Sequence, residues 1–333
     1  MNHNLALLTL PILALLLICA VAASARETPN LRAVTGTIEN DSASGTDRNY
    51  TNGFRLSWTF SEAERDPITR WAATRLLSAK TNSRVFRGLS FGQSIFTPRD
   101  IERPTPPPNQ RPYGAWLYAD YAVLVQHQDR VDRLSLQIGL AGDNALGGEV
   151  QNEVHRLLGI ERALGWDSAI DGEVGVVLRF NRRYPALGTG RLGLFEYDVT
   201  PVVGLTVGNI LSDIGAGAML RIGQTLEKDF GPPRVRPSLV GAGDFARHSR
   251  FHWYAFAGIE GRYVAHDFFI SGSLFRDDRL GLEPRRGVID LSAGVVLQYR
   301  RAQLAFSFVD RSEQFEAQEG SQSFASVSFG YRF

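Results

Sequence analysis

Short segments in which apolar and polar or small residues alternate recur along most of the chain after Leu31. Each segment is about ten residues long, and aromatic side chains stand near the segment ends. The clearest examples are residues 54–60, 116–124, 134–140, 253–260, 288–297 and 304–308. Alternation with a period of two is the pattern of a β-strand with one apolar face. It predicts an all-β protein, which is either a soluble sandwich or a transmembrane β-barrel.

The N-terminal residues differ from the rest of the chain. Residues 5–22 form an apolar run, and Ala23, Ser24 and Ala25 form an A-x-A processing site before Arg26. We therefore expect residues 1–25 to be a cleaved signal peptide and residues 26–333 to form a single β-barrel domain. Cys19 leaves with the signal, so we expect neither disulfides nor thiolate chemistry in the mature chain.

The C-terminal residues favour the barrel over the sandwich. After the signal, no run approaches the roughly 20 apolar residues that a membrane helix needs, so an exported chain of this kind is soluble or a barrel. Val327, Phe329, Tyr331 and Phe333 alternate with small or polar residues. A last strand with an aromatic outer face is common in bacterial outer-membrane barrels, although an ordinary final strand would look similar. We predict a protein of the cell outer membrane.

The strand-like runs number thirteen, whereas a single-chain bacterial barrel closes with an even number of strands. One run must be merged, doubled or outside the wall, and we predict twelve antiparallel strands. Between the runs, residues 66–79 have helical character, residues 99–112 are rich in proline, and residues 227–250 form a long basic loop. The runs begin near Leu31, Asn52, Arg84, Tyr113, Asp132, Asp171, Gly190, Asp213, His252, Phe268, Gly287, Arg301 and Ser323.

Residues 146–161 interrupt the strand pattern with helical spacing. Gln151 and His155 lie at i and i+4, so their polar ends can converge on one spot. Glycines at 147 and 148 open the predicted helix, and we expect it to end at Gly159. The alternative is a surface helix in which His155 is solvated. An apolar stripe, which we expect to pack against another element, recurs at i, i+4, i+7 and i+8 in Val150, Val154, Leu157 and Leu158.

A second unusually polar stretch, residues 39–53, lies between the first two predicted strands. It crowds carbonyl, carboxylate and hydroxyl oxygens together, from Asn40, Asp41, Asp47, Thr51 and Asn52. Hard cations such as Ca²⁺ take several oxygen ligands of this mixed kind. The alternative is an ordinary turn, because Asn, Asp, Ser and Gly are also the turn-forming residues, and the spacing does not match an EF-hand loop.

The two polar stretches are expected at the same rim of the barrel. With the N-terminus in the periplasm, the loop after strand one and the helix after strand five both reach the extracellular side. His155 would supply a base active near neutral pH, and the loop a metal. This combination suits attack of an activated water on an ester. A serine route is less favoured, because Ser42, Ser44 and Ser57 lie outside any G-x-S-x-G turn.

Several motifs resemble the outer-membrane lipid A 3′-O-deacylase family (LpxR-like). They are NDSxSGTDRxYTNG at residues 40–53, RPYGAWLY at 111–118 and GGEVQNxxHRLLG at 147–159 followed by Trp166, with a further patch at 207–209 and 220–223. The resemblance extends over essentially the whole mature chain. It implies a twelve-stranded barrel whose calcium-dependent activity removes the 3′-linked acyloxyacyl group from lipid A in the outer leaflet, with the site facing the extracellular side.

The resemblance also implies roles for individual residues. His155 matches the general base that acts on water, with Gln151 on the same helix and Thr51 as a hydroxyl residue of the site. Calcium would be surrounded by Asn40 and Asp41 of the loop together with Glu161, six residues after the histidine. The division of these residues between direct and indirect ligands stays open.

Charge and composition bear on the partners. The formal net charge is +1, which gives no sign of nucleic-acid binding. Of 36 basic residues only Lys80 and Lys228 are lysines, which leaves 34 arginines, and the arginine fork binds phosphate bidentately. Lipid A or lipopolysaccharide, the expected substrate, is phosphorylated. We expect a monomer among outer-membrane lipids. The candidate phosphate-binding residues at the rim are Arg48, Arg103 and Arg111, with Arg250, Arg279, Arg285 and Arg286 as further candidates if their connections lie on the same side, which the sequence leaves open.

Two other function classes stay open at this level. One is a different outer-membrane esterase or phospholipase that uses the same water, histidine and metal. The other is a barrel without catalysis, such as a pore. A pore predicts a polar, open lumen, whereas the enzyme predicts that His155 is held rigidly beside a cation site.

Overall fold

The computed structural model of the protein describes residues 30–41, 49–61, 66–185, 187–224, 248–278 and 280–333, together with the single positions 226, 235 and 245. The predicted signal peptide at residues 1–25 lies outside this range. Residues 42–48 and most of the predicted loop at 227–250 also lie outside it, and so do Arg48 and Arg279.

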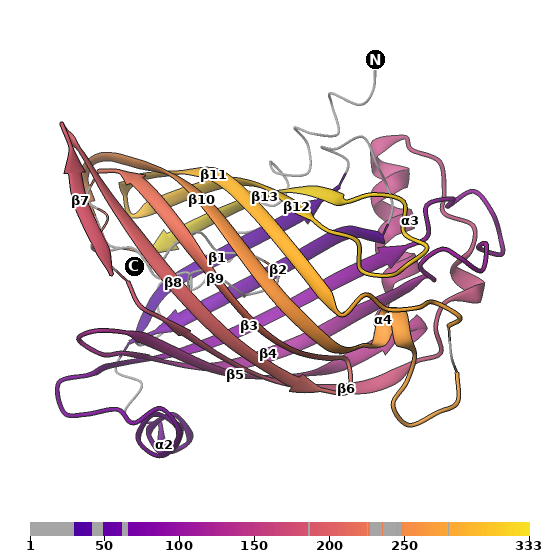
Figure 1. Ribbon diagram of the computed structural model, residues 1–333, viewed down its shortest axis with the longest axis horizontal. Helices are drawn as coiled ribbons and strands as arrows, with labels where there is room; N and C mark the ends of the chain where they lie inside the picture. Colours follow the sequence, from indigo (N-terminus) through magenta and orange to yellow (C-terminus); the bar gives the residue numbers. More distant parts are fainter. Residues whose placement is uncertain are drawn as a thin grey trace.

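Twelve antiparallel strands form a closed barrel, as predicted (Figure 1). The ring runs in sequence order, β13 pairs with β1, and the pairing of β6 with β8 closes it. The strands of the wall are β1 (Leu31–Asn40), β2 (Asn49–Phe60), β3 (Arg84–Thr97), β4 (Gly114–Gln126), β5 (Val131–Gly142), β6 (Glu173–Arg183), β8 (Phe195–Gly208), β9 (Leu211–Gly223), β10 (His248–Asp267), β11 (Gly287–Arg300), β12 (Ala302–Arg311) and β13 (Gln322–Arg332).

Two of the thirteen predicted runs need correction. The run near Gly190 contains two strands, because β7 (Gly188–Leu192) forms a hairpin with the start of β8 and stays outside the ring. The run near Phe268 is a short helix, α4 (Phe268–Ser271), and not a strand. Asp267 accepts a hydrogen bond from the Phe269 amide at 3.0 Å and so begins the helix where β10 ends.

Other predicted connections are confirmed. The stretch at residues 66–79 contains α2 (Pro67–Trp71) and the π-helical turn η4 (Ala72–Leu76). The proline-rich residues 99–112 contain no helix or strand. Within the described residues, no helix is long and apolar enough to cross a membrane.

Alternation along each strand separates an apolar outer face from a polar inner face. In β10, Tyr254 and Arg262 are buried, whereas Ile259 is 51% exposed, with its side chain on the other face. In β13, Ser328 and Gly330 are buried, and Phe329 between them is half-buried on the outer face, as the C-terminal pattern predicted. The outer face of the barrel is therefore the apolar one, as a lipid environment requires.

Paired charges and aromatic rings fill the described part of the lumen. Arg55 and Arg133 both donate to Asp120, at 3.0 and 2.9 Å, and Arg311 donates to Asp290 at 2.9 and 2.8 Å. All five side chains are buried. A water-filled channel would leave such groups exposed, so the packing argues against an open pore.

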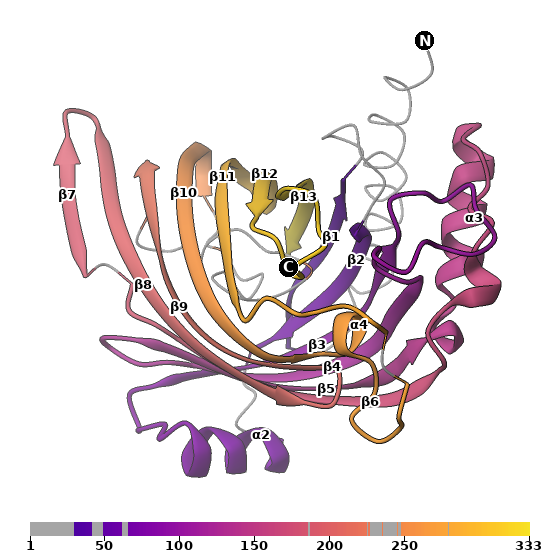
Figure 2. The same cartoon turned by 45° about the vertical axis from the view of Figure 1, so that its right-hand side comes forward.

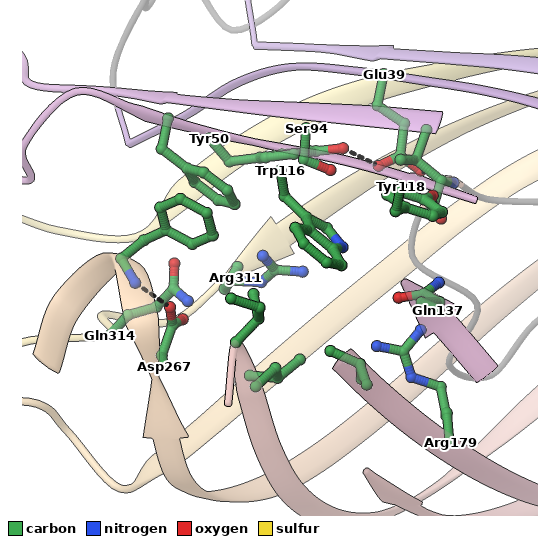
Figure 3. A pocket seen from close by; sticks show the side chains of 16 residues that line it. Glu39, Tyr50, Ser94, Trp116, Tyr118, Gln137, Arg179, Asp267, Arg311 and Gln314 are labelled. Atoms are coloured by element: carbon green, nitrogen blue, oxygen red, sulfur yellow. Dashed lines mark hydrogen bonds between the residues drawn. The ribbon is translucent and has the colours of Figure 1, made fainter. Parts of the chain in front are cut away.

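Aromatic rings and a few polar groups line a cavity of about 90 Å³ inside the barrel (Figure 3). Trp116 and Tyr118 of β4 point into it, as does Ser94 of β3. One water molecule needs roughly 10–15 Å³ by this measure, so the cavity holds a few waters and no long acyl chain. These residues also show which faces of β3 and β4 point inward. The other faces of the two strands therefore belong to the outer surface of the barrel.

Antiparallel pairing puts the two polar stretches at the same end of the barrel. The β1–β2 and β5–β6 connections both lie opposite Leu31 and Phe333, at what we call the distal end. The β5–β6 connection carries α3 (Gly147–Leu158), which lies at the opposite end of the molecule from α2 in both views (Figures 1 and 2). Chain topology alone therefore brings these stretches to one rim.

Candidate active site

The predicted helix forms, but the face that packs is not the one expected. α3 spans Gly147–Leu158, and Gly159 ends it in the left-handed region at φ 66°. Its buried residues are Gly147, Gln151 and His155. The apolar stripe was predicted to pack, yet Val150 is 38% exposed and Leu157 is 61% exposed. Val154 and Leu158 are half-buried, so the stripe lies at the edge of the packed face. The flank that carries Gln151 and His155 is the face that packs, and the prediction that the apolar stripe is the packing face was wrong.

α3 begins on the outer surface of the barrel wall, near its distal end. Since Ser94 and Trp116 face the lumen, their neighbours Ile95 and Ala115 face outward. Phe91, further down the same outer face, is 46% exposed, but Ile95 and Ala115 are 1% and 0% exposed. They are covered by a cluster that includes Ala145, just before the helix. Gln93 on the same face donates to the Ala145 carbonyl at 2.6 Å.

This position determines which face of the helix is buried. Gly147 touches Ala115 of the wall, and Gln151 and His155 follow at i+4 and i+8 on the same helical face. The opposite face, which carries Glu149, Glu153 and Arg156, is exposed. The apolar stripe lies between these two faces, and its Val154 and Leu158 are half-buried.

Trp166 explains the Gly147–Gly148 pair, which sequence reasoning took only as the opening of a helix. A Cβ atom on Gly147 would lie 2.3 Å from the Trp166 ring and 2.7 Å from the Ala115 Cβ. A Cβ on Gly148 would lie 2.9 Å from the same ring. Trp166 begins the short helix η6 (Trp166–Ser168), and its ring centroid is 5.1 Å from that of Tyr113. The glycines therefore let α3 approach the indole closely.

The indole of Trp166 holds the side chain of Gln151. Nε1 of Trp166 donates to Oε1 of Gln151 at 2.8 Å. Gln151 is 4% exposed, and its Nε2 has no hydrogen-bond partner within the described part of the chain. Leaving a buried donor unsatisfied costs about 1–3 kcal/mol, so such a group calls for a functional or ligand-related explanation.

A backbone carbonyl fixes the tautomer of His155. Nδ1 of His155 lies 2.6 Å from the carbonyl oxygen of Glu161, and the imidazole is 6% exposed. Because a carbonyl only accepts, Nδ1 carries the proton and Nε2 carries the lone pair. The ring is therefore oriented as a general base must be, with its basic nitrogen directed away from the bond that holds it.

Asn152 keeps this carbonyl in place. Its Oδ1 accepts from the Ala163 amide at 2.9 Å, and its Nδ2 donates to the Ala163 carbonyl at 3.4 Å. These two bonds fasten the returning chain, residues 160–164, to the side of α3. Neither Asn152 nor Trp166 was among the predicted site residues, although both lie within or directly after the motif at residues 147–159.

The first loop contributes a separate buried group. Asp41 is 0% exposed, and its amide donates to the Thr51 carbonyl at 3.2 Å. The hydroxyls of Thr51 and Thr97 are 2.6 Å apart, and both side chains are buried. Asn40 pairs in register with Asn52 at the end of the β1–β2 ladder and is half-buried. Thr97 is a further residue that the sequence did not indicate.

The oxygen atoms of this loop are of the types that bind a hard cation. Asn40, Asp41 and Thr51 offer amide, carboxylate and hydroxyl oxygens, the ligand types that Ca²⁺ takes. In the part of the chain that the structure describes, no three His, Cys, Asp or Glu side chains gather into a metal-holding group. The Glu161 side chain is exposed, and its described contact with the site is the backbone carbonyl on His155. Calcium binding therefore stays a proposal.

The predicted phosphate-binding arginines differ in how accessible their side chains are. Arg111 is 1% exposed and stacks on Phe96, with Cζ 5.0 Å from the ring centroid, so it cannot reach a lipid head group. Burial lowers the pKa of its guanidinium to about 10. Arg103 is exposed and pairs with Asp100 at 2.6 Å, and half-buried Arg285 pairs with Glu313 and Glu316. Arg286 is also exposed at the distal end, whereas Arg250, at the start of β10, lies at the opposite end of the barrel, so its predicted place at the rim was wrong.

Fold and site together define an outer-membrane β-barrel protein with a polar helix face buried against its outer wall. The chain belongs to the family of outer membrane protein LpxR, which matches residues 10–333. Among solved structures, LpxR from Salmonella typhimurium is similar, with 18% identity, coverage of 90% of this chain and 100% of that one, and a TM-score of 0.73. The resemblance seen in the motifs is thus confirmed at the level of the family.

More remote barrels also match. The beta domain of the Bordetella autotransporter Brka has 9% identity, coverage of 91% of this chain and 100% of that one, and a TM-score of 0.44. The translocator domain of the autotransporter NalP from Neisseria meningitidis has 11% identity, coverage of 95% and 93%, and a TM-score of 0.40. No curated protein matches the chain by sequence.

Proposed function

We propose that the protein is a lipid A deacylase, which hydrolyses the 3′-linked acyloxyacyl ester of lipid A at the extracellular leaflet of the outer membrane. The nucleophile is a water molecule activated by His155. Membership of the LpxR family supports this activity class. The observation that carries the proposal for this chain is the place of His155, on a buried polar helix face that packs on the outer surface of the wall.

A site on the outer surface suits a membrane lipid. A soluble substrate would reach a lumen or an extracellular cleft, whereas a lipid moves laterally and meets the barrel on its outer face. An ester between sugar and acyl chain lies where polar and apolar surroundings meet. His155 and Gln151 are polar groups on that surface, and the exposed apolar side chains of Leu157 and Val150 border them. The arrangement therefore favours an amphiphilic ester.

The dimensions of α3 are compatible with a site shared between the helix and the first loop. The helix starts against β4 and also contacts β3. From Gly147 to His155 the helix rises about 12 Å at roughly 1.5 Å per residue. Three strand spacings, from β4 to β1, span about 14 Å. A helix that crosses the strands in that direction brings His155 to the loop oxygens of Asp41 and Thr51.

The chemistry follows from the tautomer of His155. Its Nε2 takes a proton from water while the water oxygen bonds to the ester carbonyl carbon, and the carbonyl π electrons move onto oxygen. When the carbonyl re-forms, the bond to the 3′ oxygen of the sugar breaks, and that oxygen receives the proton from His155. The products are a sugar hydroxyl and an acyloxyacyl carboxylic acid.

The remaining site residues complete this scheme. Asn40, Asp41 and Glu161 would hold calcium, which when bound supplies positive charge beside the developing oxyanion. Thr51, held by its bond to Thr97, contributes a hydroxyl on the loop side. Glu161 contributes in two ways. Its backbone carbonyl orients His155, and its exposed side chain is available to the cation.

The test is mass spectrometry of lipid A from cells that carry the intact chain, the His155→Gln variant or no copy. We expect loss of the mass of the 3′-linked acyloxyacyl group with the intact chain only. Unchanged lipid A in the presence of assembled wild-type barrel would overturn the proposal. Release of fatty acid from glycerophospholipids instead would point to the phospholipase alternative.

A further inference from the structure

We infer that Trp166 is a positioning residue that fixes the amide of Gln151, so that Gln151 Nε2 donates a hydrogen bond to the carbonyl oxygen of the bound ester. This inference rests on the proposed function. It adds the amide of Gln151, which Trp166 holds, to the groups that act with His155. Nε1 of Trp166 and Oε1 of Gln151 are 2.8 Å apart.

The identity of the donor follows from the chemistry of the two side chains. An indole nitrogen only donates, so the oxygen of the Gln151 amide must be the atom that faces Trp166. The NH₂ group then points the other way. It is buried in a residue that is 4% exposed, and it meets no hydrogen-bond acceptor within the described residues. An oxyanion site requires a donor of this kind, shielded from water and not yet hydrogen-bonded, before the substrate binds.

Trp166 is itself held firmly. Its ring lies against Gly147 and Gly148, where any side chain would collide with it, and against Tyr113 at a centroid distance of 5.1 Å. Tyr113 is 0% exposed and donates from its hydroxyl to the Ile101 carbonyl at 3.2 Å. The indole therefore has little freedom to turn, and the amide orientation it imposes on Gln151 is preorganised.

Gln151 is also well placed relative to His155. The two residues are four apart on the buried face of α3, and side chains at this spacing have Cβ atoms about 5–6 Å apart. The base and the donor can thus act on the two sides of one carbonyl group, His155 through the water and Gln151 through the carbonyl oxygen. Without the indole, the amide could rotate and present its oxygen to the oxyanion, which would repel it.

A double-mutant cycle tests the inference. Purified full-length protein in detergent micelles with lipid A and calcium gives kcat and KM for wild type, Trp166→Phe, Gln151→Ala and the double variant. We expect Gln151→Ala to lower kcat by about 10²–10³-fold, the usual loss for one oxyanion donor. Trp166→Phe should lower kcat at least about tenfold with little change in KM, and it should cost nothing further in the Gln151→Ala background.

Additive losses in the cycle, or full activity of Trp166→Phe, would overturn the inference. Trp71→Phe, at an exposed position in α2, serves as the control for tryptophan replacement and should leave activity unchanged. Gln151→Glu provides a second test of the donor role of Gln151 if Trp166→Phe does not assemble. It keeps an acceptor for the indole but loses the donor, so it should be as impaired as Gln151→Ala, and retained activity would again contradict us.

An activity-independent measurement separates this inference from the proposed function. In ¹⁵N-tryptophan-labelled protein, five indole N–H signals are expected from the mature chain, and Trp166→Phe identifies one of them. That signal should move upfield in Gln151→Ala, because its hydrogen bond is lost. An unmoved signal overturns the positioning bond. A moved signal together with wild type that is inactive on lipid A overturns the proposed function, and the donor role with it.

Discussion

His155 Nδ1 and the backbone carbonyl oxygen of Glu161 are 2.6 Å apart, which joins the last turn of α3 to the chain that returns toward the barrel. The contact places the proton on Nδ1 and the lone pair on Nε2. It also means that Glu161 acts on His155 through an atom that no side-chain substitution removes. The two residues were predicted to share a site, but through the Glu161 carboxylate and a cation.

Replacing His155 by glutamine should abolish deacylation and leave the barrel assembled. Glutamine keeps hydrogen-bonding capacity but cannot take a proton from water near neutral pH, so the loss should be about 10²–10⁴-fold. Assembly is followed by heat-modified gel mobility and activity by lipid A mass spectrometry. Glu153→Gln, on the exposed side of the same helix, is the matched control. A His155→Gln variant with more than about a tenth of wild-type activity would remove His155 from the mechanism.

Activity should depend on calcium. The oxygen-rich set of Asn40, Asp41 and Thr51 is a hard-metal ligand set, and chelation should therefore stop turnover. Adding calcium back should restore it, whereas zinc, which prefers nitrogen and sulfur ligands, should restore less. The measurement is the deacylation rate before chelation, in chelator and after each metal. Full activity in excess chelator contradicts the metal role.

Glu161→Gln should separate the two contributions of this residue. The backbone carbonyl stays, so the His155 orientation is retained, and only the exposed carboxylate is lost. We expect a higher calcium concentration for half-maximal activity, with most of kcat recovered at saturating calcium. A calcium titration of wild type and variant decides this. Loss of kcat that calcium does not restore would show that the side chain does more than bind the cation.

Asp66 should stabilise α2, in the β2–β3 connection, in a pH-dependent way. Its carboxylate accepts from Thr69 Oγ1 at 2.5 Å, from Tyr121 at 2.6 Å and from the Thr69 amide at 2.8 Å. These bonds, that to the Thr69 side chain first, lower the pKa of Asp66. A lowered pKa means that the stabilisation is complete above the unfolded value, about 3.9, and is lost as the pH falls below it.

The corresponding variant is Asp66→Ala, which should cost about 1 kcal/mol as the loss of a helix N-cap. Hydrogen exchange of the α2 amides should be faster in the variant near neutral pH. At a pH well below 3.9 the difference from wild type should shrink, because the wild-type carboxyl is then protonated. Equal exchange at neutral pH would contradict a capping role.

Deletion of Phe333 should impair insertion into the outer membrane. Phe333 packs with Phe329 and Leu31 in an apolar cluster at the end of β13, and its amide donates to the Arg32 carbonyl at 2.9 Å. The deletion loses this aromatic contact at the point where β13 meets β1. Cell fractionation should find less heat-modifiable barrel in the outer membrane. Unchanged recovery would count against the role of the terminal residue.

The sequence by itself determined the barrel, because a period of two along a strand reports one apolar and one polar face whatever lies around it. It also determined the position of α3 to within a few residues, through the helical spacing of Gln151 and His155 and the stop at Gly159. The motifs sufficed to identify the family, and the even strand number followed from closure. These features depend on local pattern or on the topology of a closed sheet.

Only the tertiary structure decided which face of α3 packs and what holds its polar groups. Periodicity separates the face of Val150 and Leu157 from that of Gln151 and His155, but it carries no information on which side lipid or protein lies. The helix sits on the outer wall with the face of Gln151 and His155 buried, and its apolar stripe lies at the edge of that face. The Trp166–Gln151 bond and the Glu161 carbonyl on His155 likewise depend on how the chain returns after α3, and no spacing in the sequence encodes that path.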